Sequence, residues 1–312
     1  MTITCPLCES SNIELKDRIR TDDLIALYRR LLGTEIASEL KAVRDIGYYH
    51  CLDSDLYFFS PPLTGSDLFY ENLQRFSWYY MDEKNEYQYA KQLIKETDSV
   101  LEIGCGKGAF AKMIAVKSYV GLEFNKKAIA AATADGIKVR NESIERHSAE
   151  HIGAYDVVCA FQVMEHISDV RAFLKSCVAC LKPGGLLLLS VPGLDSFSRH
   201  IPNFILDMPP HHVTRWTDRA LASVAASFPL EVVSIWHEPL QPIHRSYYAQ
   251  TFYSHSFSNM LHRKQRLIDR GIVQKIVSGM GRVIGGLFAK SLSEPAFMPR
   301  GISVTAVYRK LP

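Results

Sequence analysis

The middle of the chain alternates short apolar runs with segments of helical spacing, and this alternation constrains the fold more than any other feature. Apolar runs rich in Val, Leu and Ile are typical of strands buried on both faces. The strand-like runs are residues 99–104, 119–124, 136–141, 154–162, 185–192 and 230–238, and the helix-like segments are residues 109–116, 125–135, 169–181 and 217–228. Strand–helix alternation favours a parallel sheet. The sequence therefore predicts an α/β fold, a mostly parallel sheet with helices on both faces.

Two regions lie outside this alternation. Residues 1–62 contain a Cys pair and a third Cys, and residues 239–300 contain aromatic residues followed by an apolar helix. The last segment, residues 301–310, alternates like a strand and needs a sheet edge. We expect it to return to the central sheet, which makes residues 239–300 an insertion.

Composition and charge exclude several classes of protein. The 312 residues are 47% hydrophobic and 22% charged, which is globular usage, and the net charge of +3 comes without a dense Lys/Arg stripe. Nucleic acid is therefore not the expected partner. No apolar stretch reaches the ~20 residues of a membrane span, and the start of the chain lacks the pattern of an export signal. Together with seven cysteines, an odd number, this predicts a cytoplasmic protein of a reducing compartment.

A glycine-rich turn follows the first strand of the alternation. It contains Gly104, Gly106 and Gly108 after the acidic Glu102, and Glu123 ends the second strand. Glycines at a strand-to-helix turn let the backbone approach a ligand closely, and Glu123 can accept hydrogen bonds from ribose hydroxyls. The glycine pattern alone also fits a dinucleotide. Glu102 favours a ligand with a cationic amino group, because a carboxylate repels a pyrophosphate.

Four segments in order, VLEIGCGKG, GLE, YDVVCAFQVMEHI and LKPGGLLLLSVP, resemble the class I S-adenosylmethionine-dependent methyltransferases. The resemblance implies a seven-stranded, Rossmann-like sheet with an antiparallel last strand, and S-adenosylmethionine as methyl donor. It places the methionine end of the donor at Glu102 and the glycine loop, the ribose at Glu123 and the adenine near residues 142–144. The donor-binding residues expected in this way are Glu102, Gly104, Cys105, Gly106, Gly108, Glu123, Phe124, Glu142, Ser143, Ile144 and Gln162.

Transfer to a hydroxyl needs a base, most often His. His166 follows the fourth strand, and His211 and His212 follow the fifth, so all three lie at the sheet edge where α/β folds bind ligands. Two prolines stiffen the loop before His211. We expect His211 or His212 to be the base, and the sequence does not decide between them. A purely structural role is the alternative for each of the three.

The acceptor is predicted from weaker resemblances. The string PPHHVTRW looks like one found in small methyltransferases of bacterial polysaccharide clusters, which implies a nucleotide-linked or polysaccharide sugar methylated at oxygen or carbon. QVMEHI also resembles ubiquinone-biosynthesis methyltransferases, so a quinone-type small molecule is an alternative. Two further alternatives remain. One is an RNA base methyltransferase with an N-terminal zinc knuckle, and the other is a non-catalytic module that only binds the donor.

The N-terminal cysteines suggest a zinc site. Cys5 and Cys8 have the spacing of a metal knuckle, and the segment resembles the zinc-binding start of some sugar methyltransferases, in which a second such pair follows. Here Cys51 is followed three residues later by Ser54 instead of Cys. A tetrahedral site would then need His50, Asp53 or water as the fourth ligand. The alternative is that the cysteines pack as small apolar residues.

The chain is thus expected to comprise an N-terminal zinc-ribbon-like module (1–62), a helical lead-in or lid (63–97), the methyltransferase domain (98–238 and 301–312) and the insertion (239–300). The lead-in includes Tyr79 and Tyr80, either of which could cover the donor. The insertion is expected to be an acceptor wall or an oligomer contact. Its amphipathic helix at 271–292 needs a partner surface, for which core packing, a homodimer and a peripheral membrane contact are the alternatives.

Overall fold

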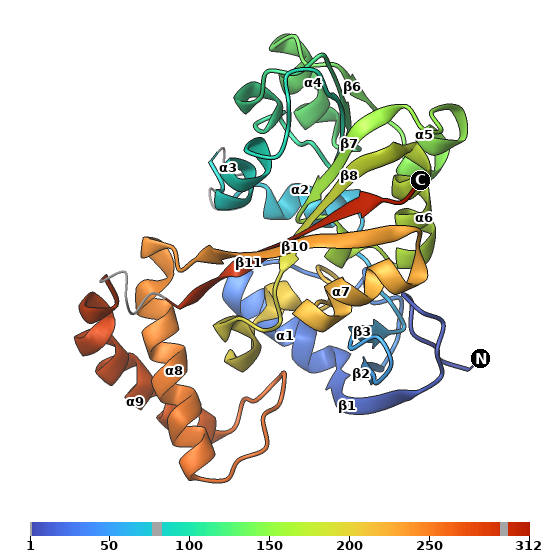
Figure 1. The fold of residues 1–312 in the computed structure, drawn as a ribbon. Coiled ribbons are helices and arrows are strands. Elements are labelled where there is room, and N and C mark those ends of the chain that lie inside the picture. The colour runs from blue at the N-terminus through green and yellow to red at the C-terminus, as the bar shows by residue number, and fades with distance from the viewer. Residues whose placement is uncertain (1, 77–82, 294–298) are drawn as a thin grey trace.

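The computed structural model describes residues 2–76, 83–293 and 299–312, and their strands form two sheets (Figure 1). Tyr79 and Tyr80 lie outside the described residues. The central sheet has seven strands in the order β10–β11–β8–β7–β4–β5–β6. Its strands are β4 (Ser99–Ile103), β5 (Ser118–Leu122), β6 (Val139–Arg140), β7 (Tyr155–Phe161), β8 (Leu181–Pro192), β10 (Leu230–Pro239) and β11 (Arg300–Lys310).

The strand directions confirm the predicted topology. β4 pairs in parallel with β5 and β7, β5 with β6, and β7 with β8. β11 lies between β8 and β10 and is antiparallel to both. The last strand therefore returns to the sheet, and the predicted insertion corresponds to residues 240–299, between β10 and β11. The carboxyl ends of β4, β5 and β7 meet at one edge, where the glycine turn, Glu123 and the histidines follow.

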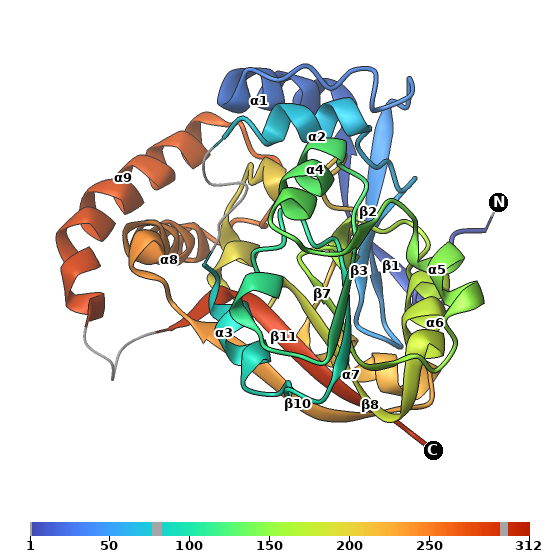
Figure 2. The same ribbon diagram turned by 90° about the horizontal axis from the view of Figure 1, so that it is seen from above.

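Helices cover both faces of the central sheet (Figure 2). They are α3 (Asn85–Lys91), α4 (Lys126–Ala134), α5 (Ile144–Glu150), α6 (Val170–Cys180) and α7 (Asp218–Ser227). Alternate residues of β7 face opposite cores. Val158 packs into the core that includes α6 and α7, whereas Val157 and Cys159 pack into the core that includes α3. Burial on both faces explains why these strands are apolar runs without polar alternation.

The helix expected at residues 109–116 is wrong. The structure has a single short 3₁₀ turn there, η1 (Ala111–Met113), and Ile114 is already extended. The glycine turn takes up the residues directly after β4, and β5 begins at Ser118. Turns continue from Gly106 through Phe110, so the segment expected to be helical begins as a turn.

The N-terminal region forms a second sheet of order β1–β2–β3–β9. Its elements are β1 (Ile13–Arg20), α1 (Thr21–Leu32), β2 (Asp45–Cys51), β3 (Tyr57–Ser60) and α2 (Asp67–Leu73), together with β9 (Thr214–Arg215). β9 is separated by one residue from the two adjacent histidines, His211 and His212, so this sheet holds the loop that carries them. Cys5, Leu7 and Phe58 also belong to the same hydrophobic core as the central sheet. Residues 1–62 are therefore not an independently packed module.

The insertion forms a helical hairpin of α8 (Arg245–Met260) and α9 (Ile272–Phe288), which extends to one side of the central sheet (Figures 1 and 2). Gly281 and Gly285 allow close packing, because a Cβ at either position would lie within 2.5 Å of an atom of α8. The opposite side of α9 leaves a row of apolar side chains exposed, including Val283 and Leu287. In the described part of the chain, only Ile272–Ser291 is long and apolar enough for a membrane span.

Candidate active site

A cavity of about 1030 Å³ lies at the carboxyl edge of the parallel strands. Nine of the residues predicted to bind the donor line it, and so do the three candidate bases. The donor residues are Gly104, Cys105, Gly106, Glu123, Phe124, Glu142, Ser143, Ile144 and Gln162, and the bases are His166, His211 and His212. The structure therefore brings the predicted donor site and the predicted bases into one space.

The glycine turn approaches the cavity with its backbone. Gly104 and Gly106 have φ values of +70° and +53°, which favour glycine. A Cβ at Gly104 would lie 2.5 Å from Val163 Cγ2, so a side chain there would clash as well. The Gly104 N–H donates to the Leu122 carbonyl at 2.8 Å, which ties the turn to the end of β5.

Glu123 is fixed at the end of β5 by backbone hydrogen bonds. Its Oε2 accepts from the Gly106 N–H at 2.9 Å, and its Oε1 accepts from the N–H groups of Phe124 and Asn125 at 2.8 Å. A carboxylate has about four acceptor positions, so these three bonds leave capacity for a ribose hydroxyl. Glu123 thus joins the glycine turn to the start of α4 and presents an acceptor to the cavity.

The wall predicted to contact adenine begins α5. Ser143 caps this helix, because its Oγ accepts from the Arg146 N–H at 3.3 Å. Glu142 lies 2.7 Å from His147 Nδ1, and this hydrogen bond is the largest influence holding the pKa of Glu142 below its usual value. His147 Nε2 in turn lies 2.8 Å from the Tyr155 hydroxyl. The buried His147 therefore orients Glu142, a role that the sequence pattern did not reveal.

Glu102 differs from the expectation. It is 1% exposed and does not line the cavity, and neither does Gly108. The Tyr119 hydroxyl donates to Glu102 Oε2 at 2.5 Å. Burial raises the pKa of Glu102 to about 8. The carboxylate therefore lies behind the glycine turn and is not placed to contact the methionine end of a donor.

This burial predicts a pH effect on stability. The folded protein keeps a proton on Glu102 between pH 4.5 and about 8, whereas the unfolded chain releases it. The stability contributed by this proton is therefore present below pH 4.5 and lost as the pH rises towards 8. Calorimetric scans at pH 5 and pH 8 give the fall in Tm for each protein. The fall should be several degrees smaller for Glu102→Gln than for wild type, since 1 kcal/mol corresponds to about 2–4 °C. Equal falls in both proteins would contradict the assignment.

The three candidate bases form one cluster, in which each Nδ1 atom faces an oxygen. His166 Nδ1 lies 2.6 Å from the His211 carbonyl, and His211 Nδ1 lies 2.7 Å from the Leu206 carbonyl. His212 Nδ1 lies 3.1 Å from Asp207 Oδ1. Burial lowers the pKa of His166 to about 4, and lowers the pKa values of His211 and His212 well below the usual range. At neutral pH the rings are therefore neutral, and Nδ1–H donation leaves the lone pair on Nε2.

The histidine loop is held by an ion pair that reaches the N-terminal sheet. Arg215 donates to Asp207 Oδ2 from Nε at 2.7 Å, and its Nη2 lies 2.6 Å from the same oxygen. Arg215 Nη1 also donates to the Tyr48 hydroxyl on β2 at 3.0 Å. Asp207 therefore connects His212 to the N-terminal region. The sequence did not indicate a role for Asp207. Its contacts with His212 and Arg215 depend on the conformation of a loop, and no local motif shows that conformation.

Glu165 lies next to the cluster, as the middle residue of the 3₁₀ turn η2 (Met164–His166). It is 1% exposed, and its Oε1 lies 4.0 Å from both His166 Nε2 and His212 Nε2. Among the described residues, neither carboxylate oxygen of Glu165 has a hydrogen-bond partner. Burial raises its pKa to about 8.

The N-terminal cysteines converge as the zinc prediction requires. The Sγ atoms of Cys5, Cys8 and Cys51 lie within 4.8 Å of one another, and Ser54 Oγ lies 3.3 Å from Cys5 Sγ. Burial raises the pKa of Cys5 to about 12. Burial also acts to raise the pKa of Cys51, but hydrogen bonds, first among them one from the Ser54 side chain, hold it below its usual value. Three thiols and a hydroxyl therefore fit a tetrahedral cation with one weak ligand.

His50 is not in this group, so its prediction as a ligand is corrected. Its Nε2 lies 2.6 Å from Asp55 Oδ1, and its ring stacks on Tyr57. His50 lies on β2, where neighbouring side chains point to opposite faces of the sheet. Cys51 therefore faces the other cysteines, while His50 faces away.

A metal analysis tests the cysteine site. Protein purified without added metal should contain one zinc ion per chain held by these thiols, and Cys8→Ser should lose it and have a lower Tm, because bound metal stabilises only the folded chain. Cys180→Ser is the matched control, since Cys180 is a buried cysteine of α6 outside the group. Equal zinc in wild type and Cys8→Ser would mean that these thiols only pack.

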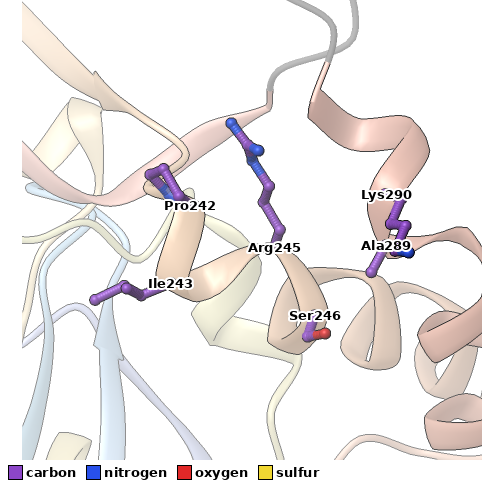
Figure 3. A pocket seen from close by; sticks show the side chains of 6 residues that line it. All are labelled: Pro242, Ile243, Arg245, Ser246, Ala289 and Lys290. Carbon is purple, nitrogen blue, oxygen red and sulfur yellow. The ribbon is translucent and has the colours of Figure 1, made fainter.

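A second, more open hollow of about 470 Å³ lies between the start of α8 and the turn after α9 (Figure 3). Its lining includes Arg245 and Lys290 but none of the predicted donor or base residues. We assign no part of the methyl-transfer site to it.

A family model described as a methyltransferase domain matches residues 70–235, which is more than half of the chain. The chain belongs to this family. It is a class I S-adenosylmethionine-dependent methyltransferase, and S-adenosylmethionine is its methyl donor. The matched residues include the glycine turn, Glu123 and all three clustered histidines.

Several curated relatives carry the name ubiquinone biosynthesis O-methyltransferase. The protein from Cronobacter sakazakii is 32% identical over 99 residues, which cover 29% of this chain and 41% of the relative. The protein from Vibrio parahaemolyticus is 31% identical over 114 residues, which cover 34% of this chain and 46% of the relative. The chain thus spans about half the length of these relatives.

Solved structures of similar fold include a SAM-dependent methyltransferase from Archaeoglobus fulgidus. That protein is 18% identical with a TM-score of 0.49, covering 79% of this chain and 100% of its own. A putative methyltransferase from Bacillus halodurans is 15% identical with a TM-score of 0.48, covering 73% of this chain and 100% of its own.

Proposed function

We propose that this methyltransferase moves the donor methyl group to a hydroxyl oxygen of a small molecule bound beside the histidine cluster. The observation that carries the proposal is the shared cavity, which joins Glu123 and the glycine turn to the half-buried imidazole of His166 and the buried imidazoles of His211 and His212. A cavity of about 1030 Å³ has room for both a donor and a small acceptor.

The chemistry needs alignment and a base. The methyl carbon of a sulfonium is electrophilic, so the protein must hold the acceptor oxygen in line behind it at ~3 Å and exclude water. The acceptor hydroxyl must also lose its proton. His211 and His212 are the proposed bases, because both are buried and both use Nδ1 for hydrogen bonding, which leaves Nε2 to accept a proton.

We propose a nucleotide-linked or polysaccharide sugar as the acceptor. The support is a polar wall on the side of the cavity next to β10 and β11. Gln162 Nε2 donates to the Ser303 Oγ at 2.9 Å, and Gln241 Nε2 donates to Glu238 Oε2 at 2.7 Å. All four side chains line the cavity. Amide, hydroxyl and carboxylate groups are suited to bind the several hydroxyls of a sugar.

A hydroxylated aromatic ring is the second candidate acceptor. The curated relatives named ubiquinone biosynthesis O-methyltransferase support it. Tyr70 and Leu206 also line the cavity near the histidines and offer an aromatic and an apolar contact to a ring. The candidates differ in what must surround the reacting hydroxyl: a sugar needs polar partners throughout, whereas a phenol needs an apolar slot.

A transfer assay with methyl-labelled donor tests the proposal. One arm offers nucleoside diphosphate sugars, the other offers dihydroxylated benzene rings, and product analysis identifies the methylated atom. We expect label on an ether oxygen in one arm. Donor binding without transfer to any hydroxyl compound would favour the non-catalytic donor module. Label recovered only on RNA, with a steep salt dependence, would favour a base methyltransferase.

A further inference from the structure

We propose that Glu165, His166 and His212 bind a divalent transition-metal ion, which coordinates the acceptor hydroxyl, and that His211 is the imidazole that takes its proton. This inference rests on the proposed function, because it describes the acceptor side of the same cavity. It also assigns different roles to His211 and His212, either of which the sequence alone allows as the base.

The candidate nitrogen ligands lie close together, and their Nε2 atoms are unprotonated, as metal binding requires. A ligand atom from each of the three histidines lies within 4.8 Å of those of the other two. His166 donates its Nδ1–H to the His211 carbonyl at 2.6 Å, and His212 Nδ1 lies 3.1 Å from Asp207 Oδ1. A metal-binding imidazole almost always donates its other N–H to a carbonyl or carboxylate in this way. Both Nε2 atoms therefore present lone pairs.

Glu165 supplies the anionic ligand. Its Oε1 lies 4.0 Å from His166 Nε2 and 4.0 Å from His212 Nε2, so the oxygen is equally near to the two nitrogens. Burying a carboxylate without partners is costly, and within the described ranges neither of its oxygens has a hydrogen-bond partner. A bound cation would satisfy this carboxylate. No hydrogen bond within the described protein explains why it is buried here.

The contacts behind His212 fix the orientation of its ring. Asp207 accepts from Arg215 through its other oxygen at 2.7 Å, and Arg215 is itself 5% exposed. The result is a carboxylate–histidine pair fixed in a single orientation, the arrangement that holds metal ligands in place.

The ligand types select the class of ion. Two imidazoles and one carboxylate suit Zn²⁺, Fe²⁺ or Co²⁺ better than Mg²⁺ or Ca²⁺, which prefer oxygen ligands throughout. Ligand atoms ~2.1 Å from such an ion lie about 3.0–3.4 Å apart, so each of the two 4.0 Å separations needs to close by about 0.6–1.0 Å. Three protein ligands leave open positions for an acceptor oxygen.

The remaining imidazole then has its own task. The coordinated hydroxyl loses its proton to His211 Nε2, because His211 Nδ1–H donates to the Leu206 carbonyl. The electron pair on the acceptor oxygen forms the new bond to the methyl carbon. The methyl–sulfur bond breaks, and its electron pair stays on sulfur as the neutral thioether of S-adenosylhomocysteine. The proton on His211 later passes to water.

Titration with Co²⁺ tests the site without any need for turnover. Metal-free wild type and the variants Glu165→Gln, His212→Ala, Asp207→Asn and His211→Ala are titrated calorimetrically in the absence of donor and acceptor. We expect wild type to bind one more equivalent than Glu165→Gln and His212→Ala, whose affinity should fall at least ~100-fold, and Asp207→Asn to bind ~10–100-fold more weakly. His211→Ala should keep the site.

Three controls make the titration decisive. Co²⁺ bound by the N-terminal thiols gives a thiolate charge-transfer band, which should be equal in all variants. Calorimetric binding of S-adenosylhomocysteine shows that each variant is folded, and Glu165→Gln preserves shape if His212→Ala does not fold. Equal Co²⁺ stoichiometry and affinity in wild type, Glu165→Gln and His212→Ala would overturn the metal site, and loss of the site in His211→Ala alone would overturn the division of roles.

The two proposals fail in different ways. If Co²⁺ binds in the predicted pattern but the metal-loaded enzyme methylates no hydroxyl compound, the metal site stands and the proposed function fails. If a hydroxyl is methylated while the variants and wild type bind Co²⁺ equally, the proposed function stands and the metal site fails.

Discussion

Replacing His211 by alanine should lower kcat by about 10²–10⁴-fold, the usual contribution of a positioned general base. The affinity for S-adenosylmethionine should stay within about twofold, because the residues predicted to bind the donor, such as Glu123 and Gly106, belong to other elements of the cavity. Single-turnover kinetics with labelled donor measure the first quantity, and calorimetry measures the second.

His200→Ala is the matched control for this prediction. His200 is also a histidine whose pKa is lowered by burial, but it does not line the cavity. Its loss should leave kcat unchanged. If His211→Ala and His212→Ala both keep full activity, the histidine loop has only a structural role, and the cluster does not take part in catalysis.

Glu123→Ala should weaken donor binding by about 10- to 150-fold. This range corresponds to the ~1.5–3 kcal/mol of a hydrogen bond to a charged group. The substitution removes the acceptor for the ribose and also releases the Gly106 N–H, which Glu123 holds at 2.9 Å. Calorimetric titration with S-adenosylhomocysteine gives the dissociation constant directly, without an acceptor.

Two further variants separate these effects. Glu123→Gln keeps an oxygen acceptor but loses the charge, so its affinity should lie between those of wild type and Glu123→Ala. Glu150→Ala removes an exposed carboxylate from the end of α5, outside the cavity, and should bind the donor normally. Unchanged affinity in Glu123→Ala would remove Glu123 from the donor site.

Local patterns predicted most of the sheet, because strands buried on both faces have a distinctive composition. The apolar run of β7, for example, reflects Val157 and Val158 facing two different cores. The alternation in 301–310 also predicted that the last strand returns to the central sheet, whereas its antiparallel direction was implied by the family resemblance. The structure places this strand between β8 and β10 and not at an edge. The helix expected at 109–116 failed because apolar periodicity does not reveal that turns continue from Gly106 through Phe110 and that the backbone is extended at Ile114.

The site was predictable only where its residues follow strand ends. Glu123 and Gln162 end strands of one sheet, so topology alone brings them to the same edge. Glu102 also comes from a strand, but the direction of its side chain depends on packing with Tyr119, which no local pattern shows. The contacts of Asp207 with His212 and Arg215 depend on a loop conformation held by the N-terminal sheet.

The most direct test of the account is a crystal structure with S-adenosylhomocysteine bound. The account predicts density with the ribose hydroxyls on Glu123, the adenine against Ile144, and the sulfur directed towards the space in front of His211 and Glu165. An empty cavity, or a sulfur atom that faces away from these two residues, would contradict it.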